Sequence, residues 1–209
     1  MNEMKGRGWW LNLARASVVL LAAGLANAQS PVDAAAVEAI WKRQQMNFVY
    51  RGYSTLYSCG GLQAKLEKIL TTLGARRGSV MLRAYSCDDA LAIARFQIVL
   101  TSPVEATPEN LEQLTTYDSH DALVARVRGE QLPAAEDVPR FPAVWKTISF
   151  ARSREMQLAP GDCELVLQLR RHILPRMAVH IVNDQVRCSQ FGNIGKPRLT
   201  VSALAPLEK

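Results

Sequence analysis

The chain has 209 residues, of which 48% are hydrophobic, 21% charged and 7% aromatic. That composition is typical of a globular protein, and it excludes a disordered or fibrous chain. The formal net charge is +6, which favours a nucleic-acid partner at first sight. Part of this charge lies in an N-terminal segment with the pattern of a removable signal, so the charge alone predicts no such partner.

Residues 1–28 have the three parts of a secretory signal peptide. A polar stretch with three basic residues comes first, an uncharged run from Ala16 to Leu25 follows, and Ala26-Asn27-Ala28 gives a small-x-small cleavage pattern. The apolar run is shorter than the roughly 20 residues that cross a bilayer. We expect cleavage after Ala28 and a periplasmic or secreted protein with no transmembrane segment in its mature chain. An uncleaved anchoring helix is the alternative.

Removal of this segment leaves 22 basic and 18 acidic residues, a net charge of +4. This modest excess does not indicate nucleic acid, and we predict no nucleic-acid partner. A positive surface on an exported protein fits contact with anionic envelope polymers or lipid headgroups. A surface that is simply solvated is the alternative interpretation.

Four cysteines follow the predicted signal peptide: Cys59, Cys87, Cys163 and Cys188. An even number in an exported chain favours disulfides, with three pairings open at this point. The chain has no Cys-x-x-Cys motif, and no histidine lies at metal-ligand spacing from these thiols. Neither a redox pair nor a zinc site is therefore predicted. Four free buried cysteines are the alternative.

Aligning Cys59 with Cys163 indicates an internal duplication of residues 29–102 and 141–209. In each unit a tryptophan, Trp41 or Trp145, precedes a short β-type segment, and the first cysteine opens a helix. Each helix is predicted to have one apolar face, formed by Leu62, Leu66, Ile69, Leu70 and Leu73 in the first and by Leu165, Val166, Leu169, Ile173 and Leu174 in the second. A strand then ends at the second cysteine, and an alternating strand closes the unit. The matched order predicts one disulfide in each unit, Cys59–Cys87 and Cys163–Cys188.

The predicted fold is α+β, with duplicated β-α-β-β units and both helices on one face of a mainly antiparallel sheet. Gly74 is expected to end the first helix as a glycine cap, and Pro175 to end the second. Basic residues lie at both helix ends: Arg76, Arg77, Arg170 and Arg171. They fit the helix dipole, and the alternative is an anion-binding face where the two ends converge.

Residues 103–140 connect the two units and form an acidic, proline-containing linker. They carry eight acidic and three basic residues. Within them, Ala122–Arg128 alternates in a way that predicts one strand, which could add an edge to either half of the sheet. The two units could form one domain or two. A core of about 75 residues is marginal alone, so we favour one shared domain.

Two stretches of this sequence carry a resemblance to known proteins, YSCGGLQAKLEKILTTLGA at Tyr57–Ala75 and GDCELVLQLRRHILP at Gly161–Pro175. They resemble a group of exported proteobacterial proteins with a signal peptide and a four-cysteine α+β domain. The resemblance would cover most of the mature chain. It supplies no catalytic or binding residues that could be carried over to this chain.

No set of residues in the sequence predicts a reaction. Ser119-His120-Asp121 has the residue types of a catalytic triad, but consecutive side chains point in different directions. Asp88-Asp89 is interpreted as a turn after a strand, since no calcium-binding spacing surrounds it. Gly60 and Gly61 lack the Lys-Ser/Thr that a phosphate-binding loop needs. We predict no catalytic residue, no metal and no cofactor.

Tyrosines are the clearest candidate contact residues. Tyr57 and Tyr85 each lie two residues before a cysteine of the first unit, with Tyr53 near them, and the second unit has no tyrosine at the matching positions. Such rings suit peptide, glycan or protein surfaces. The alternative is that they cap the rim of the core.

We expect a non-catalytic binding module for an envelope component, which would be a protein, a peptide or a glycan. An enzyme is the less favoured class. The alternative is a hydrolase acting on envelope material, with acid–base residues drawn from Asp88, Asp89, Glu155 or His180. A third possibility is an assembly factor that uses an exposed sheet edge.

Overall fold

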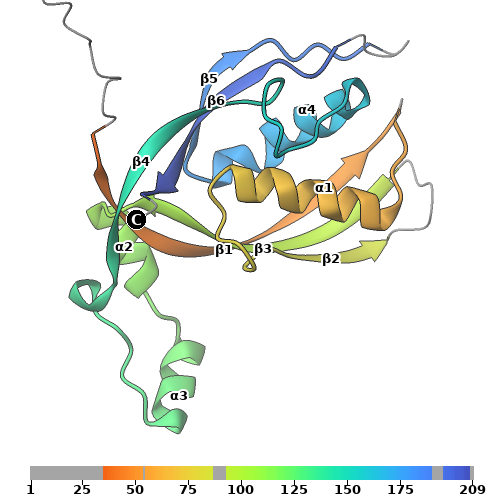
Figure 1. Cartoon of the computed structure of the whole chain (residues 1–209). Helices are drawn as coiled ribbons and strands as arrows, with labels where there is room; N and C mark the ends of the chain where they lie inside the picture. Colours follow the sequence, from red (N-terminus) through yellow and green to blue (C-terminus); the bar gives the residue numbers. More distant parts are fainter. Residues whose placement is uncertain (1–34, 54, 87–92, 190–194, 208–209) are drawn as a thin grey trace, which may run out of the picture. The chain divides into compact units, whose positions relative to one another are not determined.

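The computed structural model describes residues 35–53, 55–86, 93–189 and 195–207 (Figure 1). The predicted signal peptide, Cys87, Asp88 and Asp89 lie outside the described residues. Among the described helices, none has the length and apolar character needed to cross a membrane. The predicted cleavage after Ala28 stays a prediction.

The described chain forms one six-stranded sheet with the order β2-β3-β1-β4-β6-β5. All neighbouring strands in it are antiparallel. The α+β class and the antiparallel sheet are thus confirmed. The strands are β1 (Val37–Arg51), β2 (Met81–Ser86), β3 (Ile93–Glu105), β4 (Arg140–Ser149), β5 (Val179–Asp184) and β6 (Leu199–Pro206).

The two halves of the sheet meet over a short stretch. β1 pairs with β4 along Val37–Ile40 and Arg140–Ala143, whereas β1 pairs with β3 along nearly its whole length. The sheet curves, and helices α1 (Cys59–Thr72) and α4 (Cys163–His172) lie inside the curve (Figure 1). The short contact between β1 and β4 lets the two strands separate, which leaves room for the helices between them.

One hydrophobic core takes side chains from both halves of the chain. Phe48, Leu66 and Phe96 from the first half pack in the same cluster as Leu169 and Val201 from the second. The apolar faces predicted for the two helices are the buried faces. Neither half therefore buries its core without the other.

The C-terminal end of α1 has the predicted glycine cap. Gly74 has a φ of +100°, and the N–H groups of Gly74 and Ala75 donate to the carbonyls of Thr71 and Leu70 at 3.1 and 3.0 Å. A Cβ at position 74 would lie 2.4 Å from the carbonyl oxygen of Leu204 in β6. Glycine is required there both by the left-handed conformation and by the close approach of β6.

The segment between β3 and β4 contains helices α2 (Pro108–Thr115) and α3 (Ser119–Arg128) and the 3₁₀ turn η1 (Ala135–Asp137). The strand predicted at residues 122–128 is wrong, because these residues belong to α3. Asp118 and Asp121 form a capping box at its start, and Gly129 ends it in the left-handed conformation with φ 69°. The capping box and the glycine cap favour a helix here. The alternation of apolar and polar residues over seven positions is too short to specify a strand, because it also fits helical spacing.

Both halves have the same order of main elements, β1-α1-β2-β3 and β4-α4-β5-β6, with the 3₁₀ turns η2 (Pro160–Asp162) and η3 (Leu174–Arg176) flanking α4. The predicted bond between Cys163 and Cys188 is confirmed, with an S–S distance of 2.02 Å. The predicted Cys59–Cys87 bond involves a residue outside the described part of the chain. None of the described cysteines is free.

Candidate functional site

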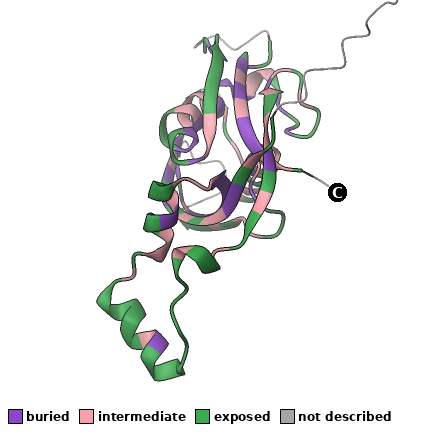
Figure 2. Ribbon diagram, turned by 90° about the vertical axis from the view of Figure 1, so that its left-hand side faces the viewer, coloured by how far each residue is buried: buried purple, intermediate pink, exposed green. Residues whose placement is uncertain are grey.

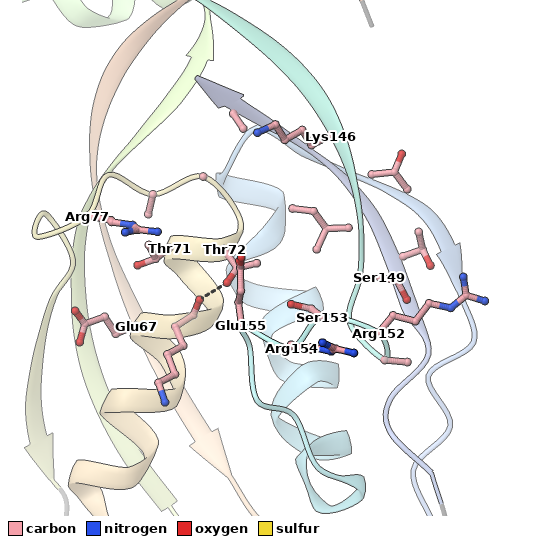
Figure 3. A pocket seen from close by; sticks show the side chains of 18 of the residues that line it. Glu67, Thr71, Thr72, Arg77, Lys146, Ser149, Arg152, Ser153, Arg154 and Glu155 are labelled. Atoms are coloured by element: carbon pink, nitrogen blue, oxygen red, sulfur yellow. Dashed lines mark hydrogen bonds between the residues drawn. The ribbon is translucent and has the colours of Figure 1, made fainter. Parts of the chain in front are cut away.

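A groove of about 1900 Å³ lies between the second half of α1 and the strands of the other half of the sheet (Figure 3). Its walls are α1, the turn that follows α1, β4, the loop at residues 151–155, and β6. The groove opens where β1 and β4 diverge, so it takes residues from both halves of the chain.

The charge of this groove is strongly positive. Two carboxylates, Glu67 and Glu155, line it together with seven cationic side chains: Lys68, Arg76, Arg77, Lys146, Arg152, Arg154 and Arg198. Among the described residues, none of these seven cations is in a salt bridge. Unpaired cations repel one another and remain available to an anion from solution. We call this feature the basic groove.

The turn after α1 places two of the cations. The Arg76 N–H donates to the carbonyl of Thr101 on β3 at 2.8 Å, and the Arg76 carbonyl accepts from the N–H of Ser79 at 3.0 Å. The Arg76 guanidinium lies 5.8 Å from the ring centroid of Trp41, which is itself stacked on Phe141 at 4.8 Å. The backbone and the ring both fix where Arg76 meets the groove.

The loop after β4 places two more cations. It is anchored by Phe150 and Met156, which are fully buried, and by the hydrogen bond from the Phe150 N–H to the Leu199 carbonyl at 2.8 Å. Between these anchors Arg152 and Arg154 are exposed and line the groove (Figure 3). The anchors hold the backbone while both guanidinium groups stay in solvent.

The floor of the basic groove combines hydroxyl groups with apolar surface. Thr71 and Thr72 of α1 face Ser149 and Ser153 across it, and Ile148 of β4 adds an apolar side chain (Figure 3). Hydroxyls and guanidinium groups both donate hydrogen bonds to anionic oxygens. No histidine or cysteine is among the described residues that line the groove.

A second polar cluster, the buried junction, joins the two halves beneath the surface. Asp162 is 2% exposed, and its carboxylate accepts from Lys65 Nζ at 2.6 Å, from the Ala159 N–H at 2.6 Å and from the Tyr57 hydroxyl. Lys65 and Tyr57 come from the first half and Asp162 from the second. Each of these donors satisfies a carboxylate that burial would otherwise destabilise.

Two phenols of this junction are held in the protonated form. Burial raises the pKa of Tyr57 far above its usual range, and the hydrogen bond to the Asp162 carboxylate raises it further. Burial also raises the pKa of Tyr50, whose hydroxyl donates to the Thr55 carbonyl at 2.8 Å. A phenol with a raised pKa stays protonated near neutral pH, so both tyrosines are available as hydrogen-bond donors, which fits a structural role.

The tyrosines singled out from sequence do not share one environment. Tyr53 and Tyr85 have 86% and 65% of their surface exposed and are accessible to a partner. Tyr57 is half-buried in the junction, with its ring 5.2 Å from that of Tyr50.

The four arginines predicted as candidate binding residues also lie in different environments. Arg76 and Arg77 line the basic groove. Arg170 pairs with Asp184, and Arg171 is exposed outside the groove. The structure therefore brings Arg76 and Arg77 together with cations of β4, of the loop after β4 and of the residue that precedes β6, rather than with the end of α4.

Sequence reasoning missed five cations of the basic groove: Lys68, Lys146, Arg152, Arg154 and Arg198. Arg152-Ser153-Arg154 is a local basic signal that could have been found after the β-type segment. Lys146 and Arg198 carry no such signal, because only the pairing of β4 with β6 brings them to one side.

The residues proposed for hydrolysis are not shown as one site. Glu155 lines the basic groove, the His180 ring lies 4.5 Å from the Trp145 ring with a tilt of 37°, and Asp88 and Asp89 lie outside the described residues. Asp118, His120 and Asp121 place three ligand atoms within 4.8 Å at the exposed start of α3. Two of them are the carboxylates of the capping box, which accounts for their position.

Comparisons with protein-family models, curated protein sequences and solved structures find no match to the chain.

Proposed function

We propose that this protein is an exported, non-catalytic binding module whose basic groove holds an extended anionic component of the cell envelope. One observation carries the proposal: seven cations and two carboxylates line a groove of about 1900 Å³, and the cations have no salt-bridge partner among the described residues. Keeping so many unpaired cations together opposes folding through their repulsion, and an anionic ligand removes that repulsion.

The spread of the cations favours a polymer over a small ion. They come from α1, the turn after it, β4, the following loop and the neighbourhood of β6. A small anion would contact a few of them, whereas a chain of repeated carboxylates or phosphates would meet most of them. Long-range charge attraction also speeds the capture of such a chain.

The signal-peptide pattern and the disulfide support the proposed compartment. Residues 1–28 have the sequence of an export signal, and the Cys163–Cys188 bond fits an oxidising compartment. We further propose that the two halves are diverged copies of one β-α-β-β unit. The shared element order and the sheet order β2-β3-β1-β4-β6-β5, with equivalent strands at equivalent distances from the centre, support this.

A binding experiment with a defined probe tests the proposed function. The probe is a fluorescein-labelled polyuronate oligosaccharide, with uncharged dextran of similar length as the ligand control, and the readout is fluorescence anisotropy. The double variant Arg152→Glu with Arg154→Glu reverses two groove charges. The matched control, Arg171→Glu with Arg176→Glu, makes the same change in charge on exposed residues outside the groove.

We expect the groove variant to lose at least about tenfold in affinity and the control variant to change by about twofold or less. We also expect affinity to fall as salt rises, because the attraction is screened. Equal losses in the two variants would mean that overall charge, not the groove, holds the polymer. No measurable binding by the unmodified protein would reject the proposal.

A further inference from the structure

The outer face of the first half of the sheet is turned away from the core and takes no part in the basic groove. Along the second part of β1 and the first part of β3, buried and exposed residues alternate (Figure 2). Phe48, Tyr50 and Phe96 lie in the core, so the residues between them point outward. The outward set therefore consists of the odd-numbered positions of β1 and β3 and of the β2 residues that pair with them.

This outer face carries four exposed arginines, which come from all three strands: Arg43, Arg51, Arg83 and Arg95. No Asp or Glu occurs at residues 39–51, 81–86 or 93–104 of these strands. Within the part of the chain that the structure describes, none of the four arginines is in a salt bridge. Three amide side chains lie among them: Gln45, Asn47 and Gln97. We call these seven residues the arginine face.

The pairing of the strands spreads the arginine face over a broad area. Arg83 pairs with Gln97, and Gln97 pairs with Asn47, so these three residues form one row across β2, β3 and β1. From Arg43 to Arg51 the face extends about 26 Å along β1, and the three strands make it about 10 Å wide. Four cations therefore point to the same side of the sheet without a carboxylate between them.

The outer face of the other half of the sheet does not have this feature. The corresponding row across β4, β6 and β5 contains Thr147, Ser202 and His180. Arg140 is the one arginine within the bounds of β4, β5 and β6, and it pairs with Glu38 at 3.2 Å. Antiparallel pairing therefore does not by itself require arginines on the outer face, and their concentration in the first half needs another explanation.

Exposed apolar side chains border the arginine face. Met81 and Tyr85 of β2 have 45% and 65% of their surface exposed, and Ile93 of β3 has 38%. The register of β2 shifts between Ala84 and Ser86, so Tyr85 lies in a bulge at the edge of the sheet. A tyrosine ring combines apolar area with a hydroxyl group, which suits the boundary between water and lipid. The border therefore adds to the arginines a contact that a purely ionic ligand would not use.

The position of the arginine face favours a broad anionic surface over an enclosed chain. The face lies on the outside of the curved sheet, opposite the side that holds α1 and α4 (Figure 1). A bilayer with anionic lipids offers phosphates to the arginines and an apolar boundary to the exposed side chains of β2. The long apolar stem of arginine can lie against that boundary while its charged end reaches a phosphate. We propose that the arginine face docks the protein on an anionic phospholipid bilayer.

This contact is separate from the basic groove. No residue of the arginine face is among those that line the groove. Tyr85, which the sequence marks as a candidate contact residue, has a place in the bilayer contact and none in the groove. A protein docked in this way keeps its groove free for a polymer.

Co-sedimentation with lipid vesicles tests the inference. The probe vesicles contain phosphatidylglycerol and phosphatidylcholine in equal amounts, and vesicles of phosphatidylcholine alone are the lipid control. The face variant is Arg83→Glu with Arg95→Glu. The matched control, Arg171→Glu with Arg176→Glu, makes the same change in charge on exposed residues elsewhere. All proteins have the same N-terminal residues, so a difference between variants comes from the substituted side chains.

We expect the unmodified protein and the control variant to bind the anionic vesicles, and the face variant to lose at least about tenfold in partition coefficient. Binding should weaken as salt rises, because salt screens the attraction. A milder variant, Arg43→Gln with Arg51→Gln, should also lose binding, and it decides the matter if the charge reversal prevents folding. Tyr85→Ala should lose about threefold, whereas Val182→Ala on the opposite edge strand β5 should change nothing.

Three results would overturn the inference: equal binding to anionic and neutral vesicles, equal losses in the face and control variants, or full vesicle binding by the face variant. Failure here is distinguishable from failure of the proposed function. The face variant should bind labelled polyuronate as the unmodified protein does, whereas the groove variant Arg152→Glu with Arg154→Glu should lose polyuronate and still bind vesicles. Loss of polyuronate instead of vesicles in the face variant would make the arginine face a polymer site and reject the bilayer.

Discussion

The buried junction and the basic groove use charged side chains in opposite ways. At the junction, Asp162 is 2% exposed and receives donors from Lys65, Tyr57 and the Ala159 N–H. In the groove, cations such as Arg152 and Arg154 are exposed and have no salt-bridge partner among the described residues. Both regions connect the two halves of the chain.

The difference separates a structural role from a binding role. A buried charge is tolerated where its partners are present, and removal of one partner leaves the other uncompensated. An exposed unpaired cation contributes little to stability, and its charge remains available for a ligand. Substitutions at the junction should therefore change the free energy of unfolding, whereas substitutions in the groove should change binding.

The largest loss in the free energy of unfolding is expected from Asp162→Ala. It leaves Lys65 without its carboxylate and the Ala159 N–H and Tyr57 hydroxyl without their acceptor. We expect a loss of about 3 kcal/mol in the free energy of unfolding, measured by urea denaturation. The matched control is Asp184→Ala, which breaks a partly exposed pair with Arg170 and a 3.2 Å hydrogen bond from the Val186 N–H, and it should cost about 1 to 2 kcal/mol. Equal losses in the two variants would remove the contrast.

The second-largest loss of unfolding free energy is expected at the end of α1, which forms one wall of the basic groove. Gly74→Ala places a methyl group in a left-handed residue 2.4 Å from the Leu204 carbonyl oxygen, so we expect a loss of about 2 kcal/mol in unfolding free energy. Gly78→Ala is the control, because its φ is +75° but no atom lies within 4 Å of the added group. A Gly78→Ala loss as large as that of Gly74→Ala would show that the contact with β6 adds nothing.

Alkaline pH should lower the contribution of the buried junction to the stability of the fold. Because folding raises the pKa of Tyr57 above its usual 10.0, the unfolded chain releases this proton at a pH where the folded chain keeps it. Its contribution to stability is therefore complete below about pH 10 and is lost as the pH rises further. We expect the urea midpoint to fall above pH 10. Tyr57→Phe should weaken that dependence, and an unchanged pH profile in this variant would assign it to other groups.

The smallest effect on stability is expected in the groove. Arg152→Glu with Arg154→Glu alters two exposed side chains without a salt-bridge partner, so the unfolding free energy should stay within about 0.5 kcal/mol of the unmodified value. Because the variant has less repulsion among the groove cations, we expect a slightly higher free energy of unfolding at low salt. Urea denaturation at two salt concentrations measures both. A loss of more than about 1 kcal/mol would mean that these arginines are structural.

The elements that could be predicted from sequence are those specified locally. Gly74 marked the end of α1, the spacing of Leu62, Leu66, Ile69 and Leu70 marked its buried face, and Cys163 and Cys188 formed the predicted bond. The one element predicted with the wrong type, at residues 122–128, is a short segment in which strand and helix periods overlap.

The site was harder to predict because it depends on distant residues. Arg76 and Arg77 were recognised at the end of a helix, but their partners in the groove come from β4, β6 and a loop some 70 to 120 positions further along the chain. The role of Tyr57 likewise depends on Asp162, which is 105 residues away. The spacing of residues within one segment gives no indication of a contact between residues so far apart in the sequence.

The central claim, that the basic groove holds an extended anion, is tested most directly by mapping amide chemical-shift changes during titration with a polyuronate oligosaccharide. We predict the largest shifts at Thr71, Thr72, Arg76 to Gly78, Ser149 and Ala151 to Glu155, which line the groove. Largest shifts on β2 around the exposed Tyr85, or small shifts spread evenly over the protein, would contradict the claim.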